Sequence, residues 1–110
     1  MADTLKVLGQ VAPADTNNAD LYTVPESVQT TVSSLVVCNL TGNTPTFRVA
    51  VRPLGATVAN EHYIYYDKAM AANDSRFIII GITLSDTDVV TVRSSAADEI
   101  AFTLFGVETS

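Results

Sequence analysis

The side chains best suited to covalent or acid–base chemistry are a single histidine and a single cysteine, and no catalytic motif surrounds either. His62 and Cys38 are the only residues of their types among 110. A nucleophile needs a base within hydrogen-bond reach, and the chain has no Gly-x-Ser-x-Gly or Ser-x-x-Lys signature. We interpret His62 as a strand-edge or interface residue and Cys38 as a buried, inert thiol. We therefore predict that the protein is not an enzyme.

Two pairs of carboxylates are the nearest approach to a metal site. Asp86 and Asp88 are two residues apart, and Asp98 and Glu99 are adjacent. Calcium loops use similar spacing, but with more oxygen ligands and a glycine in the turn. A lone cysteine also excludes an intrachain disulfide and a cysteine zinc site. We interpret the carboxylates as turn residues, with Asp88 bonding backbone groups, and predict no cofactor and no metal.

Charge and composition narrow the classes of partner. The net charge is −6, and the six basic residues are scattered, so we expect neither nucleic acid nor a membrane as partner. Charged residues make up 16% of the chain, against about 25% in typical soluble domains. This deficit indicates either a surface covered by partners or strands that use Thr and Ser on their solvent faces. No apolar signal segment follows Met1, so we expect synthesis in a cytoplasm and no membrane anchor.

The elements that would position these residues are β-strands. Residues 32–39 form an apolar, β-branched run, and in residues 46–52 Phe47, Val49 and Val51 alternate with polar or small residues. Because Gly42 and Asn43 lie between the two runs, we interpret residues 30–53 as a central hairpin.

The whole chain predicts an all-β protein. About seven or eight strands recur at short spacing, with turn residues between them and no amphipathic helix. We predict one antiparallel β-sandwich, either Ig-like or a jelly roll, although a small barrel would give a similar pattern. In the last strand, Ile100, Phe102 and Leu104 share one face, and Ala101, Thr103 and Phe105 share the other.

The first twenty residues differ from the rest. Residues 1–20 are mostly polar, apart from Leu5, Val7 and Leu8 around Lys6. This segment is either a frayed terminus or an arm that adds a strand to a neighbouring subunit. We predict an N-terminal arm over 1–20 and a β-sandwich domain over 21–110, with Leu5, Lys6, Val7 and Leu8 as partner contacts.

A cluster of aromatic residues gives a second candidate contact. Strand alternation places Tyr63 and Tyr65 on one face and Tyr66 on the other. These side chains could pack in the core, form an interface or form a platform for a ligand such as a sugar. Tyr63 and Tyr65 are the candidate contacts.

A series of segments runs along almost the whole chain: residues 2–10 (ADTLKVLGQ), 21–25 (LYTVP), 32–39 (VSSLVVCN), 47–53 (FRVAVRP), 63–67 (YIYYD), 81–84 (GITL), 88–92 (DVVTV) and 102–108 (FTLFGVE). Together, in this order, they resemble a family of small all-β structural proteins from the virions of tailed bacteriophages.

The resemblance implies a non-enzymatic decoration, or cement, protein on the exterior of the capsid. Its implied partners are the major capsid protein and further copies of itself, often as a trimer, and it brings no catalytic residues. A neck, tail or baseplate component, including a module that binds carbohydrate on the host surface, is the alternative role. An acidic exterior is consistent with the outside of a shell that encloses DNA.

Overall fold

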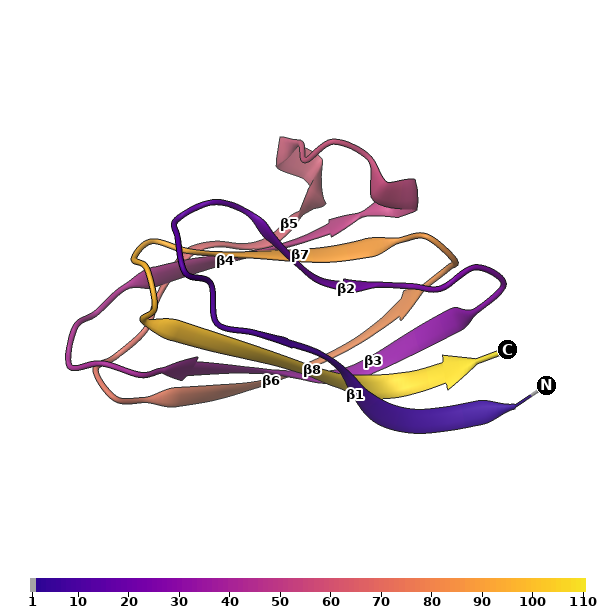
Figure 1. Cartoon of the computed structure of the whole chain (residues 1–110), viewed down its shortest axis with the longest axis horizontal. Coiled ribbons are helices and arrows are strands. Elements are labelled where there is room, and N and C mark those ends of the chain that lie inside the picture. The colour runs from indigo at the N-terminus through magenta and orange to yellow at the C-terminus, as the bar shows by residue number, and fades with distance from the viewer. Residues whose placement is uncertain (1) are drawn as a thin grey trace.

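The computed structural model describes residues 2–110, which form two stacked β-sheets (Figure 1). The strands are β1 (Asp3–Val11), β2 (Ala19–Thr23), β3 (Gln29–Asn39), β4 (Thr46–Arg52), β5 (Tyr63–Ala69), β6 (Ser75–Leu84), β7 (Val89–Ser94) and β8 (Ile100–Thr109). Two single-turn 3₁₀ helices, η1 (Pro53–Gly55) and η2 (Asn60–His62), lie between β4 and β5. No helix within residues 2–110 has the length and apolar character needed to cross a membrane.

The strand order identifies the type of sandwich. Sheet A has the order β1-β8-β3-β6 and sheet B the order β2-β7-β4-β5, and every pairing is antiparallel. Only β4 and β5 are both consecutive in the chain and neighbours in a sheet; every other connection crosses between the sheets. Two four-stranded sheets interleaved in this way form a jelly roll. The predicted all-β sandwich is confirmed, and its type is the jelly roll.

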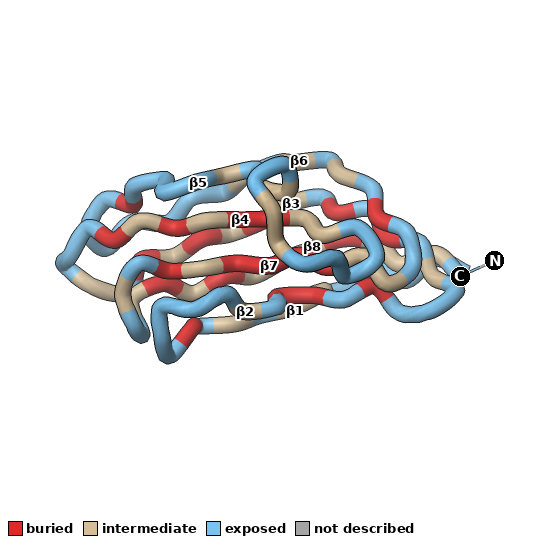
Figure 2. The backbone as a smooth tube through the Cα atoms, turned by 90° about the horizontal axis from the view of Figure 1, so that it is seen from above, coloured by how far each residue is buried: buried red, intermediate tan, exposed pale blue. Residues whose placement is uncertain are grey.

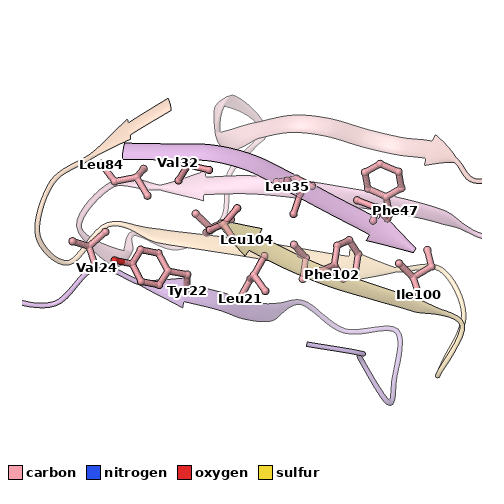
Figure 3. Packing of buried hydrophobic residues seen from close by; sticks show 14 of the residues in the cluster. Leu21, Tyr22, Val24, Val32, Leu35, Phe47, Leu84, Ile100, Phe102 and Leu104 are labelled. Carbon is pink, nitrogen blue, oxygen red and sulfur yellow. The ribbon is translucent and has the colours of Figure 1, made fainter. Parts of the chain in front are cut away.

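The core lies between the two sheets. It is built from the side chains that point inward from alternate positions along the strands of both sheets. The ring centroids of Phe47 on β4 and Phe102 on β8 are 6.1 Å apart in an edge-on contact that joins the two sheets (Figure 3). The predicted inward faces of β4 and β8 are confirmed. The largest fully buried side chains are Val24, Val32, Leu35, Val37, Phe47, Val49, Met70, Val90, Val92, Ile100, Phe102 and Leu104.

The predicted hairpin over residues 30–53 is wrong. β3 pairs with β6 and β8 in sheet A, whereas β4 belongs to sheet B. The side chain of Asn39, which is buried, fixes the crossing: its Nδ2 donates to the carbonyl oxygens of Asn43 (2.8 Å) and Ala71 (3.0 Å). Both strands have an inward apolar face, so placing them in opposite sheets lets these faces pack against each other.

The N-terminal segment is a strand of sheet A. β1 pairs with β8 from Asp3, opposite Thr109, to Val11, opposite Phe102, with a bulge at Leu8. Gly9 and Gly106 are required at close approaches, since a Cβ on Gly9 would lie 2.1 Å from the carbonyl oxygen of Leu21. The division into an arm at 1–20 and a sandwich at 21–110 stays a prediction.

Candidate functional site, an apolar interface

The outer face of sheet A carries large apolar side chains that no other part of residues 2–110 covers. The exposed fractions are 80% for Leu5, 46% for Val7, 74% for Phe77 and 80% for Ile79. Single exposed apolar residues are ordinary on protein surfaces, but a contiguous patch indicates an interaction site.

The strand register makes these residues contiguous. Val7 lies opposite Phe105, Phe105 opposite Ser34, and Ser34 opposite Ile79, so one row of side chains runs across all four strands. In a neighbouring row, Val36 lies opposite Phe77. We call this surface the apolar face and define it by Leu5, Val7, Val36, Phe77, Ile79 and Phe105.

The composition of β6 explains how an edge strand comes to contribute so much to this face. Ile78, Ile80 and Ile82 pack against the core, and Phe77 and Ile79 point away from it. A strand that is apolar on both sides is typical of a position covered on both faces. In this subunit β6 is covered on one face only and lies at the edge of sheet A (Figure 2).

The four residues predicted as contacts in the N-terminal segment have separate roles. Leu5 and Val7 lie on the apolar face, together with Phe77 and Ile79, which sequence reasoning did not single out. Leu8 packs against the core cluster. Lys6 faces the other way, and its Nζ lies 3.3 Å from Oε1 of Glu108. The signal that could have identified Phe77 and Ile79 was the run of residues in β6 that are apolar on both faces.

The predicted pairing of Tyr63 with Tyr65 on one face is wrong. β4 and β5 pair through Phe47 with Lys68, Val49 with Tyr65 and Ala50 with Tyr63, so β5 has an extra residue on each side of Tyr65. These bulges break the simple alternation of side chains along β5, so residues two apart no longer point to the same face. Tyr65 therefore packs against Phe47, with ring centroids 5.8 Å apart.

Tyr63 packs instead against Tyr66, on the outer face of sheet B. Their ring centroids are 4.9 Å apart, and the guanidinium carbon of Arg48 lies 4.0 Å from the centre of the Tyr66 ring. Arg48 also forms a forked ion pair with Asp67, with Nε 2.7 Å from Oδ1. That hydrogen bond is the main cause that lowers the pKa of Asp67.

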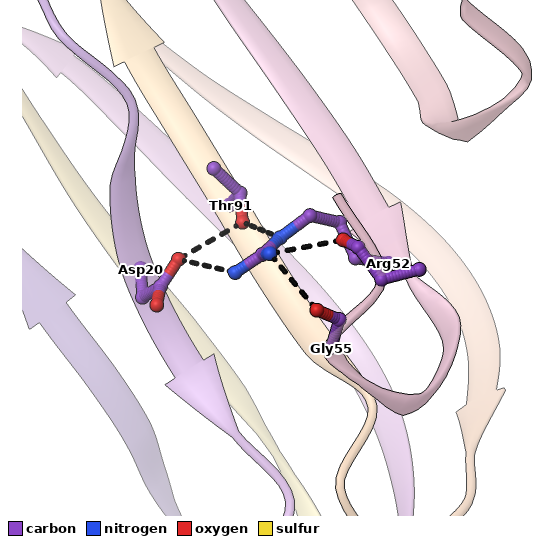
Figure 4. Close-up of polar contacts among 5 residues, drawn as sticks. Asp20, Arg52, Gly55 and Thr91 are labelled. Carbon is purple, nitrogen blue, oxygen red and sulfur yellow. Dashed lines mark hydrogen bonds and ion pairs between the residues drawn. The ribbon is translucent and has the colours of Figure 1, made fainter. Parts of the chain in front are cut away.

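Further along, sheet B is held by a second arginine. Arg52 donates through Nε to Thr91 (2.9 Å), through Nη2 to Asp20 (2.9 Å) and through Nη1 to the carbonyl oxygens of Gly55 and Ala56 (Figure 4). Its guanidinium thus joins β4, β7, β2 and the loop after η1. Apart from the Tyr63–Tyr66 pair, the outer face of sheet B is polar and internally paired, in contrast to the apolar face of sheet A.

His62 and Cys38, the side chains best suited to chemistry, lie on separate elements, η2 and β3. His62 is in the turn before β5, where its Nδ1 accepts a hydrogen bond from the backbone N–H of Ala59 (3.0 Å). Cys38 is half-buried on the outer side of β3, so its predicted burial is wrong. The predicted turn role of Asp88 is confirmed, since it accepts from the N–H groups of Leu54 and Ser85, each at 2.9 Å. Within residues 2–110 no group of three His, Cys, Asp or Glu residues is placed to hold a metal ion.

Comparison with known proteins identifies relatives of the fold. No protein-family model and no curated protein matches the sequence. The whole chain superposes on 94% of a chain from the acid-stable capsid structure of Helicobacter pylori bacteriophage KHP30, with a TM-score of 0.51 and 15% identity. It also superposes, over 97% of its length, on a chain from the structure of infectious bursal disease virus, strain Gx, with a TM-score of 0.50 and 9% identity. The protein spans about a third of that second chain. At these identities the likeness shows a common fold.

Proposed function

We propose that this protein is a non-enzymatic structural component of a virion, and specifically a cement protein that decorates the exterior of a tailed-phage capsid. The observation that carries the proposal is the apolar face on a jelly-roll subunit whose other face is polar. Chains with the same fold occur in two viral particles, one of them described as a capsid. The sequence resemblance to virion proteins of tailed bacteriophages supports the same class.

The apolar face would make the contacts that hold the subunit in the particle, with the major capsid protein and with further copies of itself. Burying one large apolar side chain contributes about 1.5–3 kcal/mol, so the four most exposed residues contribute about 6–12 kcal/mol together. Association itself costs roughly 4–15 kcal/mol. One copy alone would therefore bind the shell weakly. Several joined copies would bind it more tightly, because once one copy is bound the others are held at a high effective concentration near their sites. A homotrimer, the assembly that the sequence resemblance implies, would meet this requirement.

The charge of the protein supports a position on the outside of the shell. The net charge of −6 disfavours contact with the phosphates of packaged nucleic acid. Three of its six basic residues, Arg48, Arg52 and Arg93, are on the outer side of sheet B, and Arg48 and Arg52 are paired with carboxylates there. Sheet B is therefore suited to face solvent while sheet A faces the particle.

The direct test locates the protein and then removes its contact surface. Cryo-electron microscopy of the parent particle should show a jelly-roll domain on the capsid exterior. Purified protein added to particles that lack it should restore occupancy and raise the temperature of genome release. Val36→Lys, in the middle of the apolar face, should reduce occupancy at least tenfold. Leu54→Lys, at an exposed residue of η1, is the matched control and should bind normally. Normal binding of the Val36 variant would overturn the proposal.

An adhesion module of the neck, tail or baseplate is the second candidate, and the observation that favours it is on sheet B. Tyr63 and Tyr66 line a shallow hollow with Asn60, an arrangement in which aromatic rings and an amide could contact a sugar. Lectins also use jelly rolls. Glycan-array binding that is lost in Tyr66→Ala, with the fold intact, would favour this role. Exclusive location on the capsid would reject it.

A further inference from the structure

We propose that sheet A continues from one copy of the chain to the next, with the free edge of β1 paired antiparallel to the free edge of β6 in a second copy. This inference deepens the proposed function, because it names the surface through which copies join. Repeating one head-to-tail junction gives a closed ring when the rotations between successive copies add up to a full turn.

The topology of sheet A permits this junction without any rearrangement. All three pairings in the order β1-β8-β3-β6 are antiparallel, so β1 and β6, at opposite edges, run in opposite directions. Figure 2 shows the two strands at opposite sides of the sandwich, with β8 and β3 between them. A second copy placed beside the first therefore extends the same antiparallel pattern across the junction.

A long part of each edge strand of sheet A is free of the charges that normally prevent strands from pairing with other chains. Residues 7–11 of β1 and residues 77–84 of β6 contain no charged side chain, and the charges of these strands, Asp3 and Lys6 on β1 and Arg76 on β6, lie outside the two stretches. The edge strands of sheet B are shorter between charges, with Asp20 on β2 and Asp67 with Lys68 on β5. Proteins protect exposed edge strands with such charges, so the uncharged stretches of β1 and β6 are the parts of sheet A that are open to pairing with another chain.

The charges that β1 does carry are already paired within the subunit. The carboxylate of Asp3 accepts a hydrogen bond from the hydroxyl of Thr109 (2.9 Å), and Lys6 pairs with Glu108 at 3.3 Å. Both partners are on β8, the neighbouring strand. Pairing at the other edge of β1 would therefore leave these contacts in place.

The exposed side chains of the two edges complement each other. Leu5 and Val7 on β1 point to the same side of sheet A as Phe77 and Ile79 on β6, and these four are the most exposed residues of the apolar face. A head-to-tail junction brings the first pair against the second, in aliphatic and aromatic cross-strand contacts of the kind that stabilise sheets. A two-fold pairing of β6 with β6 would leave Leu5 and Val7 uncovered.

The junction has two different halves, so it can be tested by mixing variants. Leu5→Lys disables the β1 edge and Ile79→Lys disables the β6 edge, while Leu54→Lys is an apolar-to-charged control outside sheet A. By light scattering, wild type and control should assemble, and each edge variant alone should remain at 11.7 kDa. An equimolar mixture of the two edge variants retains one intact junction and should form a species of twice that mass. Circular dichroism should confirm that each variant is folded.

Disulfide trapping gives a second, independent readout. In a Cys38→Ser background, a chain carrying both Val7→Cys and Phe77→Cys should form covalent multimers on mild oxidation. Chains carrying only one of the two cysteines should not. Absence of cross-linking in the double variant, together with a monomeric wild type at every concentration tested, would overturn the inference.

The remaining outcomes separate this inference from the proposed function. If Ile79→Lys is monomeric and Leu5→Lys still dimerises, β6 pairs with itself and the head-to-tail junction is wrong. If the free protein is monomeric and Ile79→Lys abolishes binding to the particle, a strand of the shell covers β6, so the junction fails while the cement role stands. Head-to-tail assembly of a protein that is absent from the capsid would retain the junction and overturn the cement role.

Discussion

The hydroxyl group of Tyr22 lies 2.5 Å from Oε2 of Glu108 and 2.8 Å from the hydroxyl of Thr30. Tyr22 belongs to β2 in sheet B, whereas Glu108 and Thr30 belong to β8 and β3 in sheet A. These hydrogen bonds therefore join the two sheets across the sandwich. Glu108 also pairs with Lys6 on β1, so the network fixes the edge strand that we propose as half of the junction.

Tyr22→Phe should lower the free energy of unfolding by about 1.5–3 kcal/mol, because a hydrogen bond to a charged acceptor is lost and Thr30 keeps a buried hydroxyl without this partner. Urea denaturation of the variant and wild type measures the difference. Tyr66→Phe, which removes a hydroxyl from an exposed ring, is the control and should change stability little. Equal stability of the Tyr22 variant and wild type would show that this network contributes nothing net.

The same network should make stability depend on pH at the alkaline end. Burial, and then the hydrogen bond to Glu108, raise the pKa of Tyr22 to about 12 from its ordinary value near 10. A neutral Tyr22 is thus favoured in the folded state, so its contribution is complete below pH 10 and is lost as pH rises from 10 towards 12. The stability difference between wild type and Tyr22→Phe should shrink over that range. A difference that stays constant would contradict this assignment.

At the acidic end Glu108 should act in the opposite sense. The hydrogen bond from Tyr22, followed by that from Lys6, lowers the pKa of Glu108 against the opposing effect of burial. Its contribution to stability is present above the ordinary glutamate pKa and is lost as pH falls through the lowered value. Glu108→Gln should therefore show a smaller loss of stability on acidification than wild type, measured by thermal unfolding between neutral pH and pH 3. A parallel loss in both proteins would contradict the prediction.

Arg52→Lys should not behave as a conservative substitution. The guanidinium of Arg52 donates hydrogen bonds to Thr91, Asp20 and two loop carbonyls at once. A lysine ammonium cannot reproduce that planar arrangement of donors. We expect a loss of about 1–2 kcal/mol in the free energy of unfolding, with faster amide exchange in the loop after η1. Arg76→Lys, at an exposed residue of β6, is the matched control. Full stability of Arg52→Lys would show that the fork is dispensable.

The strands of this fold could be predicted from the sequence, whereas their pairing could not. Period-two alternation placed the inward faces of β4 and β8 correctly, because side-chain direction is a local property of an extended chain. The hairpin expected over residues 30–53 depended on which strand pairs with which. That choice was decided by the buried amide of Asn39 and by packing across the sheets, and neither is visible in a pattern of turn residues.

The candidate interface could be predicted only in part, for a related reason. Leu5 and Val7 stood out because they are apolar residues in a polar segment. Phe77 and Ile79 did not, because an apolar run in the sequence indicates burial and cannot show that its strand lies at a sheet edge. The structure brings these two pairs to the opposite edges of one face, a relationship that depends on the order of all four strands in sheet A.

The two tyrosines that sequence alternation placed together should respond differently to truncation. Tyr65 packs on Phe47 at the core side of β5, so Tyr65→Ala leaves a cavity and should cost about 2–4 kcal/mol of stability. Tyr63 contacts Tyr66 on the outer side, so Tyr63→Ala should cost less than about 1.5 kcal/mol, the range of an aromatic pair. Chemical denaturation of both variants measures the two losses under the same conditions. Equal losses would place both rings on one face, as alternation without bulges requires, and would contradict the register of β5 on β4.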